Sequence, residues 1–405
     1  MKLNLSLGGN FPGKHSQFYS EEKLNFVTIF PPGENVHLSK DVGQIPYIFA
    51  KEFGFNSLLI TESQGRFSCG DTHDPSFKVM NLRKFTIFGS VNLSTFYHLW
   101  RNAKRINVLN LYHLSMETKL LSILYKHMNP GGFTYVKLDV NIQDEKLALQ
   151  RSIPRSKIRR YLGTRFHHEF FRAVDVFSAE SAEGVEIVSR RYPMMRNKLI
   201  EVTNGIEVAN LVQDRQSIVD SKEDLIITVG RIGSYQKNNE LFLGALAKAD
   251  LKHWKVAIIG PYTLDFKILF DKFLKQNPVL QGRIDLVGNV SDKDSLMSWY
   301  RRAKILVITS RWEGFPLVFS EAQCHGNYII STNVSSVAEI TNNLQYGRIV
   351  VGDVNAISSV ITDVIENGIC SKSMASEIIM YAREKYDWKK ALQNLHKRIS
   401  IKYQC

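Results

Sequence analysis

Short apolar runs alternate with longer amphipathic stretches along most of the 405-residue chain. The apolar runs lie at 24–30, 57–61, 106–114, 133–139, 174–181 and 198–207, and again at 224–230, 254–260, 283–288, 304–310, 327–332 and 347–352. Runs of this length predict buried strands, and the stretches between them predict helices. Because strands that alternate with helices build parallel sheets covered on both faces, the pattern predicts an α/β protein.

A polar segment without aromatic residues, 209–223, separates the two series of runs. We interpret it as a linker between an N-terminal domain over 1–208 and a C-terminal domain over 224–385, followed by a helix over 386–405. Each domain is predicted to be Rossmann-like, with a doubly wound parallel sheet. Ligands of such sheets bind beyond the carboxyl ends of the strands, so we expect the site in an interdomain cleft.

The chain is basic, with a net charge of +13. Residues 75–116 hold six basic residues and no acidic one, and 151–172 hold seven basic residues beside Glu169. The excess is either a solvated basic surface or a patch for an anionic membrane or a lipid-diphosphate acceptor. Nucleic acid is not expected as a partner, because no nucleic-acid-binding motif accompanies the charge.

The sequence favours a cytoplasmic protein, with peripheral attachment to the inner face of the plasma membrane as an option. Its four cysteines are widely spaced and form no CxxC motif, which fits free thiols in a reducing compartment. The N-terminal residues lack the apolar stretch of a signal peptide. No apolar run reaches the roughly 18–20 residues that a membrane-spanning helix needs.

The most informative stretch follows the apolar run at 304–310. It reads SRWEGFPLVFSEAQCHG and places Glu313, Gly314, Phe315, Pro316 and Leu317 ahead of a short predicted helix that carries Glu321. Pro suits the first position of a helix. The N–H groups at a helix start attract phosphates, and two flanking carboxylates suit hydroxyl groups. This combination fits a ligand with a diphosphate and several hydroxyls, such as a nucleotide-sugar.

A second motif lies upstream, where VGRIGSYQKN places Gly230, Arg231 and Lys237 after a predicted strand. Arg can grip phosphate oxygens at two points, and Lys acts as a compact point charge. Gly230 lets a phosphate approach the backbone closely. Gly260, at the end of the run 254–260, suits a turn that faces a ligand.

Together the two motifs resemble those of retaining glycosyltransferase family 4, which has the GT-B fold. The resemblance is strong over 224–352 and extends to 24–207. It implies a hexosyltransferase that moves a sugar from a nucleoside diphosphate-sugar, with UDP favoured, to an acceptor hydroxyl with retention. By this resemblance Arg231 and Lys237 bind the donor diphosphate, Glu313 contacts the donor sugar, and Glu321 accepts hydrogen bonds from the ribose.

The N-terminal domain is expected to hold a glycan or lipid-linked acceptor, and here the sequence departs from the family pattern. The family often has a glycine pair on the loop after its first strand, whereas this chain offers Gly43 alone in KDVG. Relatives often have a histidine at the end of a strand where this chain has Asp139. We expect Asp139 to orient an acceptor hydroxyl or the donor sugar. His113 is either a substitute for that histidine or a core or capping residue.

No metal or cofactor is expected, because the resemblance assigns neutralisation of the diphosphate to Arg, Lys and a helix end. Asp292 and Asp294 open a predicted amphipathic helix, so N-capping explains them better than metal binding. The crowded polar residues of 69–74 indicate a turn rather than a metal site.

Three rival functions remain at this point. A sugar-phosphate synthase on the same fold would use a small phosphorylated acceptor. A two-domain binding protein would bind nucleotide or sugar without turnover. A nucleotide-sugar epimerase is the third. Among glycosyltransferase roles, we expect biosynthesis of a cell-surface polysaccharide or glycolipid.

Overall fold

The structure is a computed structural model that describes residues 18–62, 75–87, 91–139, 157–207 and 214–404. The chain divides into two compact units. The first comprises Met1–Lys137, Arg155–Phe177 and His396–Cys405, and the second comprises Leu138–Pro154 and Ser178–Leu395. The polar cluster at 69–74 lies outside the described residues.

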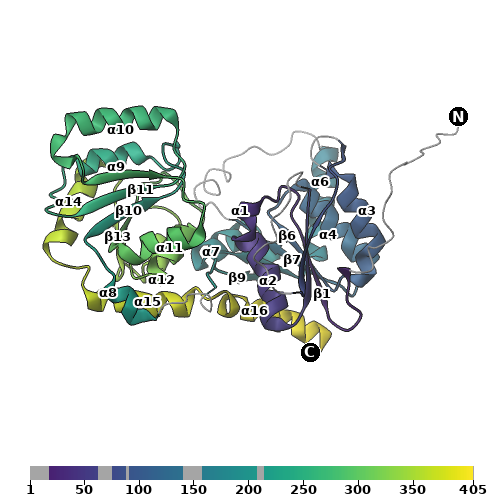
Figure 1. Ribbon diagram of the computed structural model, residues 1–405. Helices are drawn as coiled ribbons and strands as arrows, with labels where there is room; N and C mark the ends of the chain where they lie inside the picture. The colour runs from purple at the N-terminus through teal and green to yellow at the C-terminus, as the bar shows by residue number, and fades with distance from the viewer. Residues whose placement is uncertain (1–17, 63–74, 88–90, 140–156, 208–213, 405) are drawn as a thin grey trace. The chain divides into compact units, whose positions relative to one another are not determined.

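A seven-stranded sheet gathers the strands of the first half of the chain (Figure 1). Across the sheet, in order, they are β3 (Phe77–Asn81), β2 (Asn56–Thr61), β1 (Asn25–Ile29), β6 (Val108–Tyr112), β7 (Phe133–Lys137), β8 (Val176–Ala179) and β9 (Leu199–Glu201). From β3 to β7, neighbouring strands pair in parallel. Every residue of β1, β2, β6 and β7 is buried, as expected for parallel strands covered on both faces.

Helices connect these strands, and local sequence fixes several of their ends. They are α1 (Asn35–Leu38), α2 (Asp41–Phe53), α3 (Leu93–Asn102), α4 (Met116–Met128), α6 (Lys157–Ala173) and α7 (Ala182–Arg191), with short 3₁₀ helices η3 (Ala103–Arg105) and η4 (Pro193–Lys198) and an antiparallel pair β4 (Thr86–Ile87) and β5 (Val91–Asn92). Ser115 caps α4 by accepting the Thr118 N–H at 3.1 Å. Gly54 ends α2 in the left-handed conformation, with φ of 75°.

A six-stranded, fully parallel sheet gathers the strands of the second half (Figure 1). Across it, in order, are β12 (Ile284–Gly288), β11 (Lys255–Ile259), β10 (Leu225–Val229), β13 (Ile305–Ile308), β14 (Tyr328–Thr332) and β15 (Gly347–Val350). Successive residues of β10 point to opposite faces: Ile226 packs in one buried cluster and Ile227 in another.

Two layers of helices cover this sheet, as Figure 1 shows for α9, α10 and α14 against α11 and α12. The helices of the second half are α8 (Arg215–Asp220), α9 (Asn239–Leu246), α10 (Leu264–Gln276), α11 (Lys293–Arg302), α12 (Leu317–Cys324), α13 (Val337–Ile340), α14 (Val354–Glu366), α15 (Lys372–Lys385) and α16 (Trp388–Tyr403), with a 3₁₀ helix η6 (Pro278–Leu280). Cys324 and Cys370 are free thiols. Among the described helices, none has both the length and the apolar character needed to cross a membrane.

The end of α16 belongs to the first unit. The Tyr403 hydroxyl donates to the carbonyl oxygen of Asn107 at 2.5 Å. The Lys402 ammonium donates to the carbonyl oxygen of Gly132 at 2.8 Å. Segments from both ends of the described chain therefore build this unit together.

The differences from the sequence-based expectations are local. The pattern does not predict edge strand β3, whose apolar residues are interrupted by Lys78. The segment 209–223, interpreted as a linker, contains helix α8. Asp214 caps this helix by accepting the Ser217 N–H at 2.7 Å. The alternation of strands and helices is confirmed elsewhere in both halves.

Candidate functional site

The six-stranded sheet places the two motifs of the second unit at one point. Strands β11 and β12 lie on one side of β10, and β13, β14 and β15 lie on the other. In open α/β sheets, ligands bind beyond the carboxyl ends of the strands at such a topological switch point. Arg231 and Lys237 follow β10, and Glu313 follows β13, its direct neighbour. The fold thus brings together residues that lie about 80 positions apart in the sequence.

Glycines allow the backbone segments at these strand ends to pack closely against each other. A Cβ atom at Gly260, where φ is 132°, would lie only 1.8 Å from the carbonyl oxygen of Gly230. A Cβ atom at Gly230 would lie 3.0 Å from Cε of Lys237. Packing between the ends of β10 and β11 therefore accounts for Gly260, and Gly230 makes room for the Lys237 side chain. A ligand-facing role for either glycine stays a prediction.

An ion pair joins the two motifs. The Lys237 ammonium lies 2.6 Å from Glu313 Oε1, and both side chains are largely shielded from solvent. The Ser310 hydroxyl donates to the same carboxylate oxygen at 2.5 Å. A carboxylate in such a shielded place needs charge-assisted hydrogen bonds to offset its lost hydration. Ser310 was not predicted as a site residue.

Gln236 connects the ion pair to Arg231. Its amide oxygen accepts a hydrogen bond from Arg231 Nη2 at 2.6 Å. Its amide nitrogen donates to the Trp312 carbonyl oxygen at 3.0 Å and faces Glu313 Oε2 at 3.3 Å. An amide can accept from a cation and donate to an anion, which a charged side chain cannot do. Its place beside Lys237 in the motif was the only sequence signal for this role.

The segment Gly314 to Leu317 forms the entry to α12. Pro316 is the N-cap and Leu317 is the first helical residue, so the proline lies one position earlier than predicted. Phe315 is buried in the core beneath this entry. The Phe319 N–H bonds back to the Pro316 carbonyl oxygen at 3.0 Å. The helix thus starts directly beyond the switch point, with its positive end at that location.

Glu321 is held by a buried tyrosine and by a histidine. The Tyr300 hydroxyl, on α11, donates to Glu321 Oε2 at 2.9 Å. Burial and the adjacent carboxylate keep the pKa of Tyr300 well above its usual range, so the phenol stays a donor. His325 Nδ1 lies 2.7 Å from the Glu321 carbonyl oxygen, and burial lowers the pKa of His325 to about 4. Neutral His325 therefore donates from Nδ1 to this carbonyl.

Two predicted acceptor residues lie in the first unit. Gly43 is inside helix α2, so the prediction that it lies on a loop is wrong. A Cβ atom there would be 2.4 Å from the Leu38 carbonyl oxygen, which shows that close packing of α1 on α2 requires glycine. His113 follows β6, is exposed, and has a positive φ of 59°. Its N–H donates to the Lys137 carbonyl oxygen at 2.9 Å.

Asp139 lies two residues beyond β7 and belongs to the second unit. A Cβ atom at Gly314 would lie 2.6 Å from Asp139 Oδ1 and 3.6 Å from Glu180 Oε2. Asp139 and Glu180 therefore both approach the segment that follows Glu313. Glu180 was not predicted as a site residue; its Oε1 accepts a hydrogen bond from Asn204 at 2.6 Å.

No candidate metal centre appears among the described residues, where no three His, Cys, Asp or Glu side chains cluster suitably. Asp292 is the N-cap of α11 and accepts the Ser295 N–H at 2.8 Å. Asp294 lies in the first turn of the same helix. The capping interpretation of this pair is therefore confirmed for Asp292.

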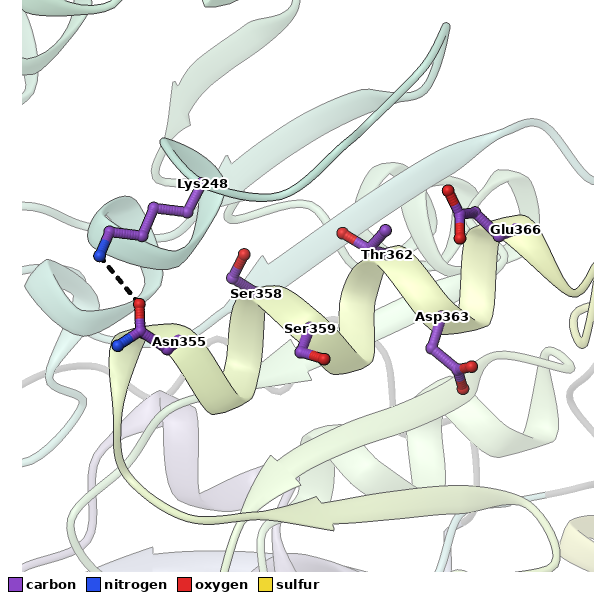
Figure 2. A pocket seen from close by; sticks show the side chains of 7 residues that line it. All are labelled: Lys248, Asn355, Ser358, Ser359, Thr362, Asp363 and Glu366. Atoms are coloured by element: carbon purple, nitrogen blue, oxygen red, sulfur yellow. Dashed lines mark hydrogen bonds between the residues drawn. The ribbon is translucent and has the colours of Figure 1, made fainter.

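A polar groove of about 540 Å³ runs along α14 (Figure 2). It is lined by Lys248, Asn355, Ser358, Ser359, Thr362, Asp363 and Glu366. Lys248 spans its end with a hydrogen bond to Asn355 Oδ1 at 2.8 Å (Figure 2). The groove shares no lining residue with the network around Glu313, and its side chains are those of a hydrophilic helix face.

The architecture is that of the GT-B fold, as predicted. The crystal structure of Anabaena Alr3699/HepE in complex with UDP superposes with a TM-score of 0.68 over 94% of this chain and 100% of that one. The two sequences are 14% identical. A likeness at this identity concerns the fold alone.

Sequence comparisons add a family match for part of the chain. Residues 212–385 match the family model described as Glycosyl transferases group 1. The phosphatidylinositol N-acetylglucosaminyltransferase gpi3 subunit of Schizosaccharomyces pombe is 27% identical over 194 residues, which are 46% of this chain and 40% of that protein. The lipopolysaccharide core biosynthesis mannosyltransferase LpcC of Rhizobium leguminosarum bv. viciae is 28% identical over 128 residues, 31% of this chain and 36% of that protein. The matches span less than half the length of these relatives.

Proposed function

We propose that the protein is a retaining glycosyltransferase of family 4. It would transfer a sugar from a nucleoside diphosphate-sugar, with UDP as the nucleotide, to an acceptor hydroxyl. The observation that carries this proposal is the network of Arg231, Gln236, Lys237 and Glu313 at the switch point. The group 1 match over 212–385 and the similarity to the two named glycosyltransferases support it.

The donor diphosphate binds to Arg231, Lys237 and the start of α12. Lys237 is already paired with Glu313, so a phosphate oxygen competes for the same ammonium group. The carboxylate that Lys237 releases or shares can accept hydrogen bonds from hydroxyls of the donor sugar. Ser310 and Gln236 keep Glu313 in place during this exchange. Glu321, fixed by Tyr300, accepts from the ribose hydroxyls.

The reaction retains the anomeric configuration by attack from the face that the diphosphate leaves. A double displacement would require a carboxylate on the opposite face of the sugar. Glu313 and Glu321 are assigned to sugar and ribose, so the leaving phosphate takes the acceptor proton. The protein contributes positioning and stabilisation of the developing negative charge. Arg231, Lys237 and the helix start supply that positive charge, so no metal is required.

Asp139 orients the acceptor hydroxyl or the donor sugar, because its carboxylate approaches Gly314 beside Glu313. His113 and Gly43 are proposed for the acceptor side, where they lie at or beyond the carboxyl ends of central strands of the first sheet. A glycan or lipid-linked acceptor in cell-surface polysaccharide or glycolipid biosynthesis fits the phosphatidylinositol and lipopolysaccharide glycosyltransferases to which the chain is similar. We place such an enzyme in the cytoplasm, peripheral to the plasma membrane.

The test is calorimetric binding of UDP, GDP, ADP and dTDP to the wild type and to Arg231→Ala and Glu321→Ala. We expect UDP to bind, and each substitution to weaken it about 10- to 100-fold, since a hydrogen bond to a charged group contributes about 1.5–3 kcal/mol. Lys267→Ala is the matched control, because its ammonium pairs with Asp271 on the exposed face of α10. Failure of all four nucleotides to bind would refute the donor site.

Turnover separates the remaining functions. Transfer from UDP-sugar to a lipid-linked or glycan acceptor, lost in Lys237→Ala, is the expected result. Unchanged turnover in Lys237→Ala would contradict the diphosphate assignment. Transfer only to a small phosphorylated sugar would favour a sugar-phosphate synthase, and conversion of the donor sugar alone would indicate an epimerase. Nucleotide binding without any turnover would favour a binding protein.

A further inference from the structure

Helix α3 of the first unit turns apolar side chains toward solvent. Thr95 and Leu99 are buried beneath the helix. On the opposite face, Leu93, Tyr97 and Trp100 are 39%, 49% and 55% exposed. Their spacing of four and three residues puts them in one stripe along the helix. The stripe is therefore not part of the core, although its pattern in the sequence is that of an amphipathic helix.

Neighbouring segments extend the stripe at the start of the helix. Phe85 is 60% exposed, and its carbonyl oxygen accepts the Leu93 N–H at 2.9 Å. Met116, at the start of α4, is 54% exposed. The next residue, Glu117, has a carboxylate that faces the Asn92 N–H at 3.4 Å. Three segments that carry large exposed apolar side chains thus come together at the first turn of α3.

Two basic residues lie on the same face toward the end of the helix. Arg101 and Lys104 are exposed, and each follows an apolar residue of the stripe by four positions. Arg101 Nη1 donates to the Tyr97 hydroxyl at 3.1 Å. The closest acidic residue along the chain, Glu117, is half-buried. The face is therefore both apolar and positively charged.

A second exposed apolar stripe on α10 provides a comparison within the same chain. Leu264 and Ile268 are 75% and 60% exposed and lie four residues apart. Asp265 and Asp271 lie on the same helix. The α10 stripe has no aromatic residue, and the lysines of this helix are interspersed with Asp265 and Asp271, with Lys267 paired to Asp271. It therefore lacks the combination of aromatic rings and cations without carboxylates found on α3.

We propose that the α3 patch, formed by Phe85, Leu93, Tyr97, Trp100, Arg101 and Lys104, docks on a bilayer that contains anionic lipids. Aromatic rings favour the level of the lipid headgroups, where their apolar body is covered and their polar tip stays wet. Basic side chains are attracted to the negative surface of such a bilayer. An exposed helix with both features on one face lies in the plane of the interface.

The charge of the patch selects this occupant over a second copy of the chain. Two copies that met through this face would bury Arg101 and Lys104 of both copies without an acidic residue in the patch to pair with them. An anionic bilayer instead offers opposite charge to every cation of the face. This docking deepens the peripheral placement proposed above and rests on it. It concerns the first unit and does not depend on nucleotide binding at the switch point, so the donor site and the docking surface can fail independently.

The test is flotation of the full chain with vesicles of phosphatidylcholine, alone or mixed with anionic phosphatidylglycerol. We expect binding to the mixed vesicles, weakened by high salt. Arg101→Gln/Lys104→Gln should weaken it about 30-fold, since each cation near such a surface contributes roughly fivefold. Tyr97→Ser/Trp100→Ser should weaken binding about tenfold, because roughly 60 Å² less apolar surface would be buried against the bilayer.

Leu264→Ser/Ile268→Ser is the matched control and should bind vesicles like the wild type. A circular-dichroism spectrum and a melting curve like those of the wild type show that each variant is folded, and absence of UDP binding in the wild type would count only against the donor site. Three results would overturn the docking proposal: no binding to the mixed vesicles, equal loss in the α10 control, or vesicle binding unchanged in both α3 variants. Conversion of a dimer to a monomer by Tyr97→Ser/Trp100→Ser, without vesicle binding, would assign the face to a second copy.

Discussion

Replacing Tyr300 by phenylalanine should weaken nucleotide binding although the side chain lies in the core. The hydroxyl of Tyr300 donates to Glu321 Oε2 at 2.9 Å, and Tyr300 is fully buried. Phenylalanine keeps the ring and its packing and removes only this donor. Because Glu321 is proposed to accept from the ribose, the substitution tests whether its carboxylate must be held in one orientation.

The structure sets the size of the effect. A hydrogen bond to a charged group contributes about 1.5–3 kcal/mol, and part of this is recovered because water can reach the half-buried Glu321. We therefore expect the free energy of unfolding to fall by about 1 kcal/mol. Ordering the released carboxylate at each binding event costs about 0.5–1.5 kcal/mol, which corresponds to roughly 2- to 12-fold weaker UDP binding.

A double-mutant cycle measured by calorimetry isolates the contribution of Tyr300. UDP affinity is compared in the wild type, Tyr300→Phe, Glu321→Ala and the double variant. If Tyr300 acts through Glu321, its substitution has no further effect once Glu321 is alanine. Equal weakening in both backgrounds would refute the reasoning, because it would show a general structural effect.

Tyr328→Phe is the matched control for this cycle. Tyr328 is also buried, and its hydroxyl donates to the Gly347 carbonyl oxygen at 3.1 Å, away from Glu321. Its substitution should lower the melting temperature without a change in UDP affinity. A comparable loss of UDP affinity in Tyr328→Phe would also count against the positioning role of Tyr300.

Two further predictions concern stability. Gly43→Ala should lower the free energy of unfolding by about 1–3 kcal/mol, because the new Cβ atom would lie 2.4 Å from the Leu38 carbonyl oxygen. Helix propensity alone would predict stabilisation by about 0.5–1 kcal/mol. Urea denaturation therefore decides between the two explanations, because a lower free energy of unfolding supports the steric clash and a higher one supports helix propensity. The second prediction is acid sensitivity from His325, whose folded-state pKa is lowered to about 4. The pKa of His325 in the unfolded state is about 6.5, so between about pH 6.5 and pH 4 the unfolded state binds more protons than the folded state. The stabilisation from neutral, buried His325 is therefore present above about pH 6.5 and is lost as the pH falls toward 4. The free energy of unfolding should decrease by at most about 3 kcal/mol over this range. In His325→Gln this part of the pH dependence of unfolding should disappear, and an unchanged profile would contradict the assignment.

Much of the fold was predictable because the strands are short, continuous apolar runs. The runs 224–230 and 304–310 contain β10 and β13, and the motifs that follow them gave the positions of Arg231, Lys237 and Glu313. The edge strand β3 was not predictable in this way, since Lys78 interrupts its pattern.

The supporting residues of the site could not be predicted because their roles depend on distant parts of the chain. Tyr300 reads as one more apolar residue of an amphipathic helix, and only the packing of α11 beside α12 brings its hydroxyl to Glu321. Gln236 meets Glu313 for the same reason, whereas Ser310 lies only three residues before Glu313 and contacts its carboxylate through a local turn that the residue pattern does not specify. Gly43 was misinterpreted because the family resemblance matched it to a glycine pair on a loop, whereas close contact between two helices also requires glycine.

The discontinuity of the first unit has a consequence for biosynthesis. Residues 396–405 belong to this unit, yet the ribosome makes them only after the whole of 178–395. Until then, the carbonyl oxygens of Asn107 and Gly132 lack the Tyr403 and Lys402 donors that cover them in the finished protein. The nascent first unit therefore lacks these contacts until Lys402 and Tyr403 have been synthesised, so folding from the N-terminus onward completes this unit only after the second unit has been made.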